Sequence, residues 1–180
     1  MSRFAGECQV WLNEMPDWAL LKPVGQVDTY WRWASRPPVS APARTAGWGF
    51  RVGFGGRGAY GVLGATFLPN DYSYLRVVVD VTGAPSGRAP KPFQEARVGL
   101  LHEYAGAVLA GSLQEADTLG PGTLAFHWGA VHEVDSSWEA FRVLSVGVGR
   151  LVALPSATAQ IPAALLPSFG GQAPPPPGVA

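Results

Sequence analysis

Glycine and proline divide this chain into short apolar segments. The 180 residues include 23 glycines and 17 prolines, and between them lie three runs rich in aromatic and β-branched residues, at 47–53, 60–68 and 74–81. Runs of this kind, bounded by turn-forming residues, predict β-strands. The glycine-rich stretch 54–59 predicts a turn that joins the first two runs into a hairpin. The framework expected of this chain is therefore a sheet.

Two later segments have the spacing of helices. Residues 92–110 form the first, with Gly111 as its predicted C-cap. The second opens near residues 134–139, where Asp135 or Ser136 can accept hydrogen bonds from first-turn amides, and it continues to about Leu154. The apolar positions of the first helix are Phe93, Ala96, Leu100, Tyr104, Ala107 and Val108, and those of the second are Phe141, Leu144, Val148 and Leu151.

The order of these segments predicts the architecture. A further strand is expected at 122–128, between the two helices, so the order is strands, helix, strand, helix. This order indicates an α+β domain with both helices on one face of a sheet. The first 35 residues hold four of the seven tryptophans, and we expect one or two strands there.

Length and composition indicate one domain with a core. The chain has a mass of 19.0 kDa, and 47% of its residues are hydrophobic while 14% are charged, a composition that argues against a disordered chain. We assign residues 1–155 to the domain. Residues 156–180 are a tail rich in proline, alanine and glycine, expected to be solvated or to serve as a polyproline ligand, and residues 36–44 are expected to be a linker or a strand lead-in.

Charge and cysteine content exclude several classes of protein. The 13 basic and 13 acidic residues balance, so any contact with RNA must come from a local patch rather than from an overall basic field. The single cysteine, Cys8, excludes an internal disulfide and a zinc site built on several thiolates. We expect neither a signal peptide nor a membrane span, and therefore a cytoplasmic location.

Three stretches, in order, resemble domain IV of translation elongation factor G. They are GGRGAYG at 55–61, VGLLHEYAGAVLAG at 98–111 and HEVDSSWEAFRV at 132–143. The resemblance covers about residues 47–154. It implies the fold that this domain shares with certain ribosomal proteins, a four-stranded sheet with two helices on one face, to which this chain adds an N-terminal strand segment.

The resemblance also implies where function lies. In the full factor this domain projects like a tRNA anticodon arm, and its tip loops enter the decoding site. The implied RNA-binding residues are Gly55, Gly56, Arg57, Gly58, Trp128, Gly129 and His132. Glycines let the backbone approach phosphate, an arginine can pair with phosphate, and a tryptophan can stack on an unpaired base.

The chain also departs from that family. It has no GxxxxGK[ST] motif, so we expect neither GTP binding nor nucleotide hydrolysis. Ala59 stands where the family usually has a polar residue, Trp128 stands where it has an acidic one, and the segment after Gly111 is longer.

Three other motifs invite chemical interpretations. Residues 53–58 spell GxGxxG, but a strand rather than a helix is expected next, so we interpret them as a hairpin loop and not as a dinucleotide site. His127, His132 and Glu133 suggest a metal, although we expect a partly buried His127 and an exposed His132. Asp135, Ser136, Ser137 and His132 suggest a hydrolase, but a capping Asp/Ser pair explains most of these residues.

The function predicted from the sequence is non-enzymatic. The leading hypothesis is a translation-factor-like domain that binds ribosomal or other structured RNA through two tip loops, without cofactor or metal. The alternative is a protein-interaction or dimerisation module that uses its aromatic N-terminal segment, with Trp11, Trp18, Trp31 and Trp33 at the interface.

Overall fold

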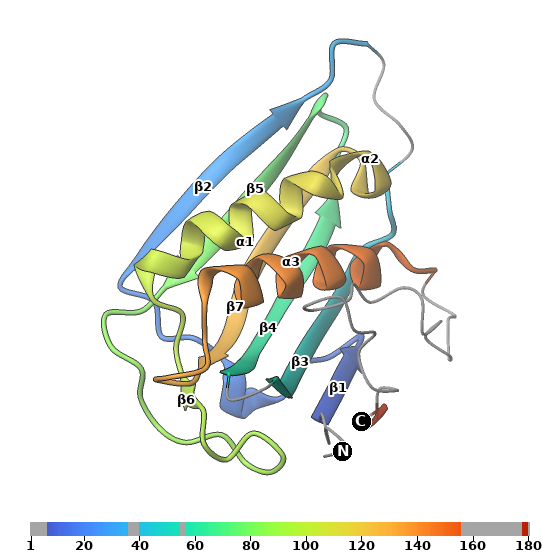
Figure 1. The fold of residues 1–180 in the computed structure, drawn as a ribbon. Coiled ribbons are helices and arrows are strands. Elements are labelled where there is room, and N and C mark those ends of the chain that lie inside the picture. The colour runs from blue at the N-terminus through green and yellow to red at the C-terminus, as the bar shows by residue number, and fades with distance from the viewer. Residues whose placement is uncertain (1–6, 36–39, 55–56, 156–177, 180) are drawn as a thin grey trace.

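The computed structural model describes residues 7–35, 40–54, 57–155 and 178–179. One twisted sheet carries the three α-helices on a single face (Figure 1). Its strands are β1 (Glu7–Leu12), β2 (Gly25–Arg32), β3 (Arg44–Phe54), β4 (Arg57–Pro69), β5 (Tyr74–Val81), β6 (Arg97–Val98), β7 (Gly122–Val131) and β8 (Gly178–Val179). The helices are η1 (Asp17–Ala19), α1 (His102–Gln114), α2 (Ala116–Leu119) and α3 (Trp138–Ala153).

The sheet is larger than the sequence predicted. Its order is β2-β5-β7-β4-β3-β1-β8, with β6 paired beside β7, so the described residues form eight strands and the prediction of four was wrong. The four expected strands are β3, β4, β5 and β7, which lie together in the middle. The N-terminal segment supplies two strands, as expected, but they lie on opposite sides of that middle part. The α+β class with helices on one face is confirmed.

Strand directions are mixed. The β3–β4 hairpin and the β4–β7 pair are antiparallel, whereas β5 and β7 are parallel and are connected through α1. With the helices toward the viewer in Figure 1, this β5–α1–β7 crossover is left-handed, the uncommon hand for such a unit.

Helix α3 forms as its sequence predicts, apart from its cap. The predicted stripe of Phe141, Leu144, Val148 and Leu151 is fully buried against the sheet. The cap is Ser137 rather than Asp135 or Ser136, because the Ser137 side chain accepts a hydrogen bond from the amide of Ala140 at 3.1 Å.

Helix α1 begins ten residues later than expected. Phe93 and Ala96 have apolar spacing, but they lie in a loop and pack against the opposite face of the sheet, while Leu100, Ala107 and Val108 pack under the helices. The apolar residues that looked like one helical stripe therefore pack on two opposite faces of the sheet. Gly111 is an interior helical residue and not a cap, and a side chain there would overlap the carbonyl of Arg142 on α3, 2.3 Å away.

The core has two layers. The larger lies between the sheet and the helices and contains Trp48, Phe50, Phe67, Phe126 and Phe141. The smaller lies on the other face, where irregular segments cover part of the sheet. It contains Trp11, Met15, Tyr60, Val62, Ala89, Phe93, Ala96 and Ala130.

Candidate functional site

The two loops that the family resemblance assigns to RNA binding meet at one end of the sheet. The end of β3, the start of β4 and the loop between β7 and α3 all lie at the lower end in Figure 1. Gly58 lies near the start of β4 and pairs with Gly53, and His132 directly follows β7. The predicted residues Gly55 and Gly56 lie outside the described residues, and Arg57 is placed as the first residue of β4.

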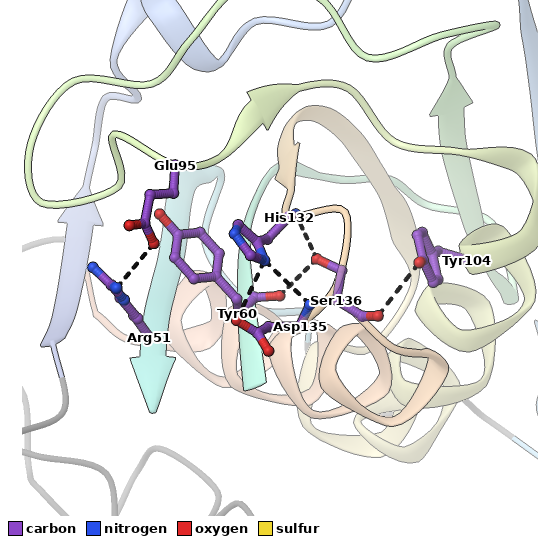
Figure 2. A network of polar contacts seen from close by, with 7 residues as sticks. All are labelled: Arg51, Tyr60, Glu95, Tyr104, His132, Asp135 and Ser136. Carbon is purple, nitrogen blue, oxygen red and sulfur yellow. Dashed lines mark hydrogen bonds and ion pairs between the residues drawn. The ribbon is translucent and has the colours of Figure 1, made fainter. Parts of the chain in front are cut away.

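Hydrogen bonds join these loops at a cluster that we call the tip junction, made of Gly58, Tyr60, His132, Asp135 and Ser136. The Tyr60 amide donates to the Asp135 carbonyl at 3.1 Å. The Ser136 hydroxyl donates to the Tyr60 carbonyl at 2.8 Å (Figure 2). Residues about 75 positions apart in sequence are therefore fixed to each other through β4 backbone.

The β7–α3 loop is also closed on itself. The His132 amide donates to the Ser136 hydroxyl at 2.8 Å, and the Asp135 amide donates to His132 Nδ1 at 3.2 Å. The Asp135 carboxylate lies 3.3 Å from the same ring nitrogen. The Ser136 hydroxyl thus gives its proton to a carbonyl, while His132 Nδ1 accepts from an amide. This arrangement stabilises a loop and does not activate a serine nucleophile.

Tyr60 forms the floor of the tip junction. Its ring stacks on His132 with centroids 5.0 Å apart, and the Arg51 guanidinium lies 6.0 Å from the Tyr60 ring centroid. The residue is 1% exposed, and its hydroxyl makes no well-aligned hydrogen bond within the described residues, although the nearby Ala96 backbone lowers its pKa slightly. This burial raises the pKa of Tyr60 to about 12. Stacking also explains why the expectation of an exposed His132 was wrong: its side chain is 19% exposed. His127 is partly buried, as expected, with its side chain 37% exposed.

Gly58 is required by a close approach. A Cβ atom at this position would lie 2.4 Å from the Asp135 carboxyl carbon. The absent side chain therefore lets the β7–α3 loop rest on β4, and the same glycine that suggested an RNA contact has a packing role.

Trp128 and Gly129 lie away from the tip junction. They pair with Gly64 and Leu63 in the middle of β4, several residues from the hairpin turn. Trp128 packs against the smaller core layer, and a side chain at Gly129 would face Leu100 and Leu21. The structure therefore brings Gly58, His132 and the start of β4 together and leaves Trp128 and Gly129 elsewhere.

Charges of both signs surround the tip junction. Arg51 pairs with Glu95 at 2.9 Å, and Arg97 pairs with Glu133 at 3.4 Å, with all four side chains at least 43% exposed. Beside them is an open hollow of about 290 Å³, lined by Arg88, Gln94, Glu95, Arg97, His132, Glu133 and Val134. Exposed pairs of this kind contribute little to stability, so their side chains remain available to a ligand.

The structure does not support the metal site or the dinucleotide-binding site that the sequence motifs suggested. Within the described ranges, no three His, Cys, Asp or Glu side chains gather as ion ligands. His127 instead contacts the buried carboxylate of Asp80, at 2.7 Å. The GxGxxG stretch leads into strand β4 and not into a helix, as the hairpin interpretation predicted. No helix in the described part of the chain has the length and apolarity to cross a membrane.

Sequence reasoning missed Tyr60 and the true role of Ser136. Tyr60 was one apolar position in a predicted strand, and Ser136 was a capping candidate. Their partnership depends on which loop folds over β4, and no local pattern encodes that contact. Compared with known proteins, the chain matches no family model and no curated sequence.

Proposed function

We propose that this chain is a non-enzymatic, translation-factor-like domain that binds ribosomal or other structured RNA through the tip of its sheet. One observation carries the proposal. The β7–α3 loop, which resembles one RNA-contacting loop in domain IV of elongation factor G, is held by the Tyr60 and Ser136 hydrogen bonds against β4, close to where the strand leaves the other resembling loop. A fixed pair of loops is a preorganised surface, which lowers the ordering cost of binding.

The residues divide into those that contact RNA and those that position the contact. Arg57 supplies a cation at the start of β4, and Arg88 and Arg97 line the adjacent hollow. His132 and Gly58 position the loop, because one is stacked on Tyr60 and the other accommodates Asp135. Binding uses no GTP, cofactor or metal, and takes place in the cytoplasm. Because the tip is not uniformly basic, the affinity is modest and sensitive to salt.

The test is co-sedimentation with ribosomes across a salt series. Arg57→Ala and Arg88→Ala each remove one cation and leave the five residues of the tip junction unchanged. We expect each to weaken binding and to reduce the slope of log affinity against log salt by about one. Ser136→Ala provides a second test. It removes the hydrogen bond that positions the β7–α3 loop without changing the net charge, so we expect it to weaken ribosome binding as well.

The matched control is Lys22→Ala, which removes the same charge elsewhere. Lys22 is exposed and follows Leu21, whose amide bonds to the mid-strand His127 carbonyl at 2.8 Å. Binding that drops equally in Lys22→Ala and Arg57→Ala would show a nonspecific attraction. Absence of binding at low salt would remove the RNA proposal.

A protein-interaction role is the second candidate, and a separate region favours it. Tyr30, Trp31 and Tyr72 lie on or beside β2 and β5 and are 48%, 40% and 62% exposed. Tyr72 stacks on Tyr74, which also contacts Tyr30, whereas Trp31 lies on the other face of β2. Exposed aromatic side chains of this kind are typical of protein interfaces.

A further inference from the structure

Strand β2 is an uncovered edge of the sheet. It pairs with β5 over its full length, from Gly25 opposite Val81 to Arg32 opposite Tyr74, and none of the described residues pairs on its other side. The opposite edge differs, because Gly178 and Val179 pair alongside β1. An edge strand presents unpaired backbone N–H and C=O groups, which can pair with another strand.

Two of the usual devices that prevent such pairing, proline and a β-bulge, are missing from β2. Its eight residues, GQVDTYWR, contain no proline or lysine, and its register with β5 has no bulge. Most of its residues are exposed, including Tyr30 and Trp31. A regular exposed edge with aromatic side chains is a site for strand addition.

The charges of β2 identify what can be added. Asp28 and Arg32 lie on the same face as Tyr30, because the three pair with Val78, Tyr74 and Arg76 on alternate positions of β5. We propose that two copies of this chain pair antiparallel through β2, with Tyr30 opposite Tyr30. In this register Asp28 of each copy lies opposite Arg32 of the other.

Other symmetric registers lose this match. Centring the pair on Asp28 or on Arg32 places like charges opposite each other, which is unfavourable. Centring it on Thr29 or Trp31 leaves each charge opposite a neutral residue. Only the Tyr30 register pairs both charges and also places two aromatic rings across the two-fold axis.

Asp28 and Arg32 can each form the additional ion pair that the dimer requires. Arg76 and Tyr30 both bond to the Asp28 Oδ2 atom, and no described residue bonds to Oδ1. Arg32 has no ion-pair partner among the described residues, and its guanidinium lies 5.9 Å from the Tyr74 ring centroid. The product is a closed two-fold dimer in which one sheet runs through both copies and both helix layers lie on the same side.

The proposed dimer does not depend on RNA binding. It specifies how the chain would act as a dimerisation module, the second candidate function. Sedimentation equilibrium of the full chain over a concentration series tests it. The wild type is expected to dimerise. Asp28→Arg and Arg32→Asp each place like charges opposite each other twice, so each should weaken dimerisation at least about tenfold.

Mixing the two variants provides the decisive measurement. In a heterodimer of Asp28→Arg with Arg32→Asp, both cross-strand pairs are again opposite in sign, so dimerisation should return although neither variant pairs with itself. The double variant carrying both changes should also pair with itself. Asp71→Arg and Arg88→Asp are the matched controls, since both residues are exposed and lie outside β2.

Several outcomes would overturn the proposal: a monomeric wild type at high concentration, single variants that dimerise like the wild type, or a mixture that stays monomeric. If Asp28→Arg fails to fold because it loses Arg76, then Arg32→Asp decides alone, since it leaves that ion pair intact. Capture of an extended foreign peptide, unaffected by the charge exchange, would assign the edge to another partner. Ribosome binding by Arg32→Asp is measured separately. Because Arg32 is not among the proposed RNA contacts, the result tests the RNA proposal independently of whether the dimer forms.

Discussion

The two faces of the sheet are covered in different ways. On one face, α1 and α3 bury a continuous apolar layer that includes Phe141 and Trp48. On the other, the η1 region and residues 82–101 cover only part of the strands, with Phe93 and Met15 as the main contacts, and Tyr30 stays exposed. Regular helices give a face its stability, whereas an irregular cover leaves room for polar contacts and for binding.

The largest expected effect is on the helix-covered face. Phe141 is fully buried and stacks on Tyr104 with centroids 4.7 Å apart. Phe141→Ala leaves a cavity between two rigid layers, so the free energy of unfolding should fall by about 4 kcal/mol. Urea denaturation measures this. A loss under 1 kcal/mol would mean that the helix layer is loosely packed.

A matched change on the other face sharpens the contrast. Phe93 is also fully buried and contacts Trp11 and Tyr60 through its ring. Phe93→Ala should cost less, about 3 kcal/mol, because an irregular segment can collapse into the space. Hydrogen exchange should rise in residues 84–98 while α1 and α3 stay protected. Equal exchange in the helices would show that both faces open together.

The third effect depends on pH. Burial raises the pKa of Tyr60 to about 12 from an ordinary value of 10.0. As pH rises from about 10 to 12, the unfolded state loses this proton first, so stability that is complete below pH 10 should fall by roughly 2–3 kcal/mol across that window. Tyr60→Phe should remove this part of the pH dependence in urea titrations.

The same variant has a second consequence at neutral pH. Because the Tyr60 hydroxyl is buried and makes no well-aligned hydrogen bond within the described residues, its removal should leave stability unchanged or slightly higher. Tyr72→Phe is the control, since Tyr72 is 62% exposed. An unchanged alkaline profile in Tyr60→Phe would contradict the assignment of this titration to Tyr60.

The smallest expected loss of stability comes from Ser136, which also belongs to the tip junction. Ser136→Ala leaves the Tyr60 carbonyl and the His132 amide without their hydrogen bonds, which should cost about 1–2 kcal/mol. Ser73→Ala, in an exposed turn, should cost almost nothing. Thermal unfolding of the two variants compares them, and equal melting temperatures would show that the junction adds no stability.

The sequence predicted the helix-covered face far better than the other. The stripe on α3 and the four central strands have regular periods, and a period reflects the face against which a segment packs. Phe93 and Ala96 lie in a loop but continue the apolar spacing of the helix that follows, so they were assigned to that helix. The N-terminal strands were expected, but local sequence does not encode which edge of a sheet a strand joins.

The candidate site was predictable only as a pair of loops. Motif order indicated that the β3–β4 turn and residues 132–137 belong together, and the hydrogen bonds at Tyr60 agree. The roles of individual residues were not accessible in the same way. His132 was expected to be exposed, and Trp128 was grouped with the tip, because neither stacking on Tyr60 nor a mid-strand register leaves a local signal.

The position of β7 has a consequence for synthesis of the chain. Residues 7–81 supply five strands, but these form two separate parts, β1-β3-β4 and β2-β5, and only β7 pairs with both. The sheet therefore cannot close until residue 131 has left the ribosome. Until then β4 and β5 each expose an inner edge that can pair with the wrong strand. A nascent chain halted before residue 122 would hold two half-sheets with no strand to join them.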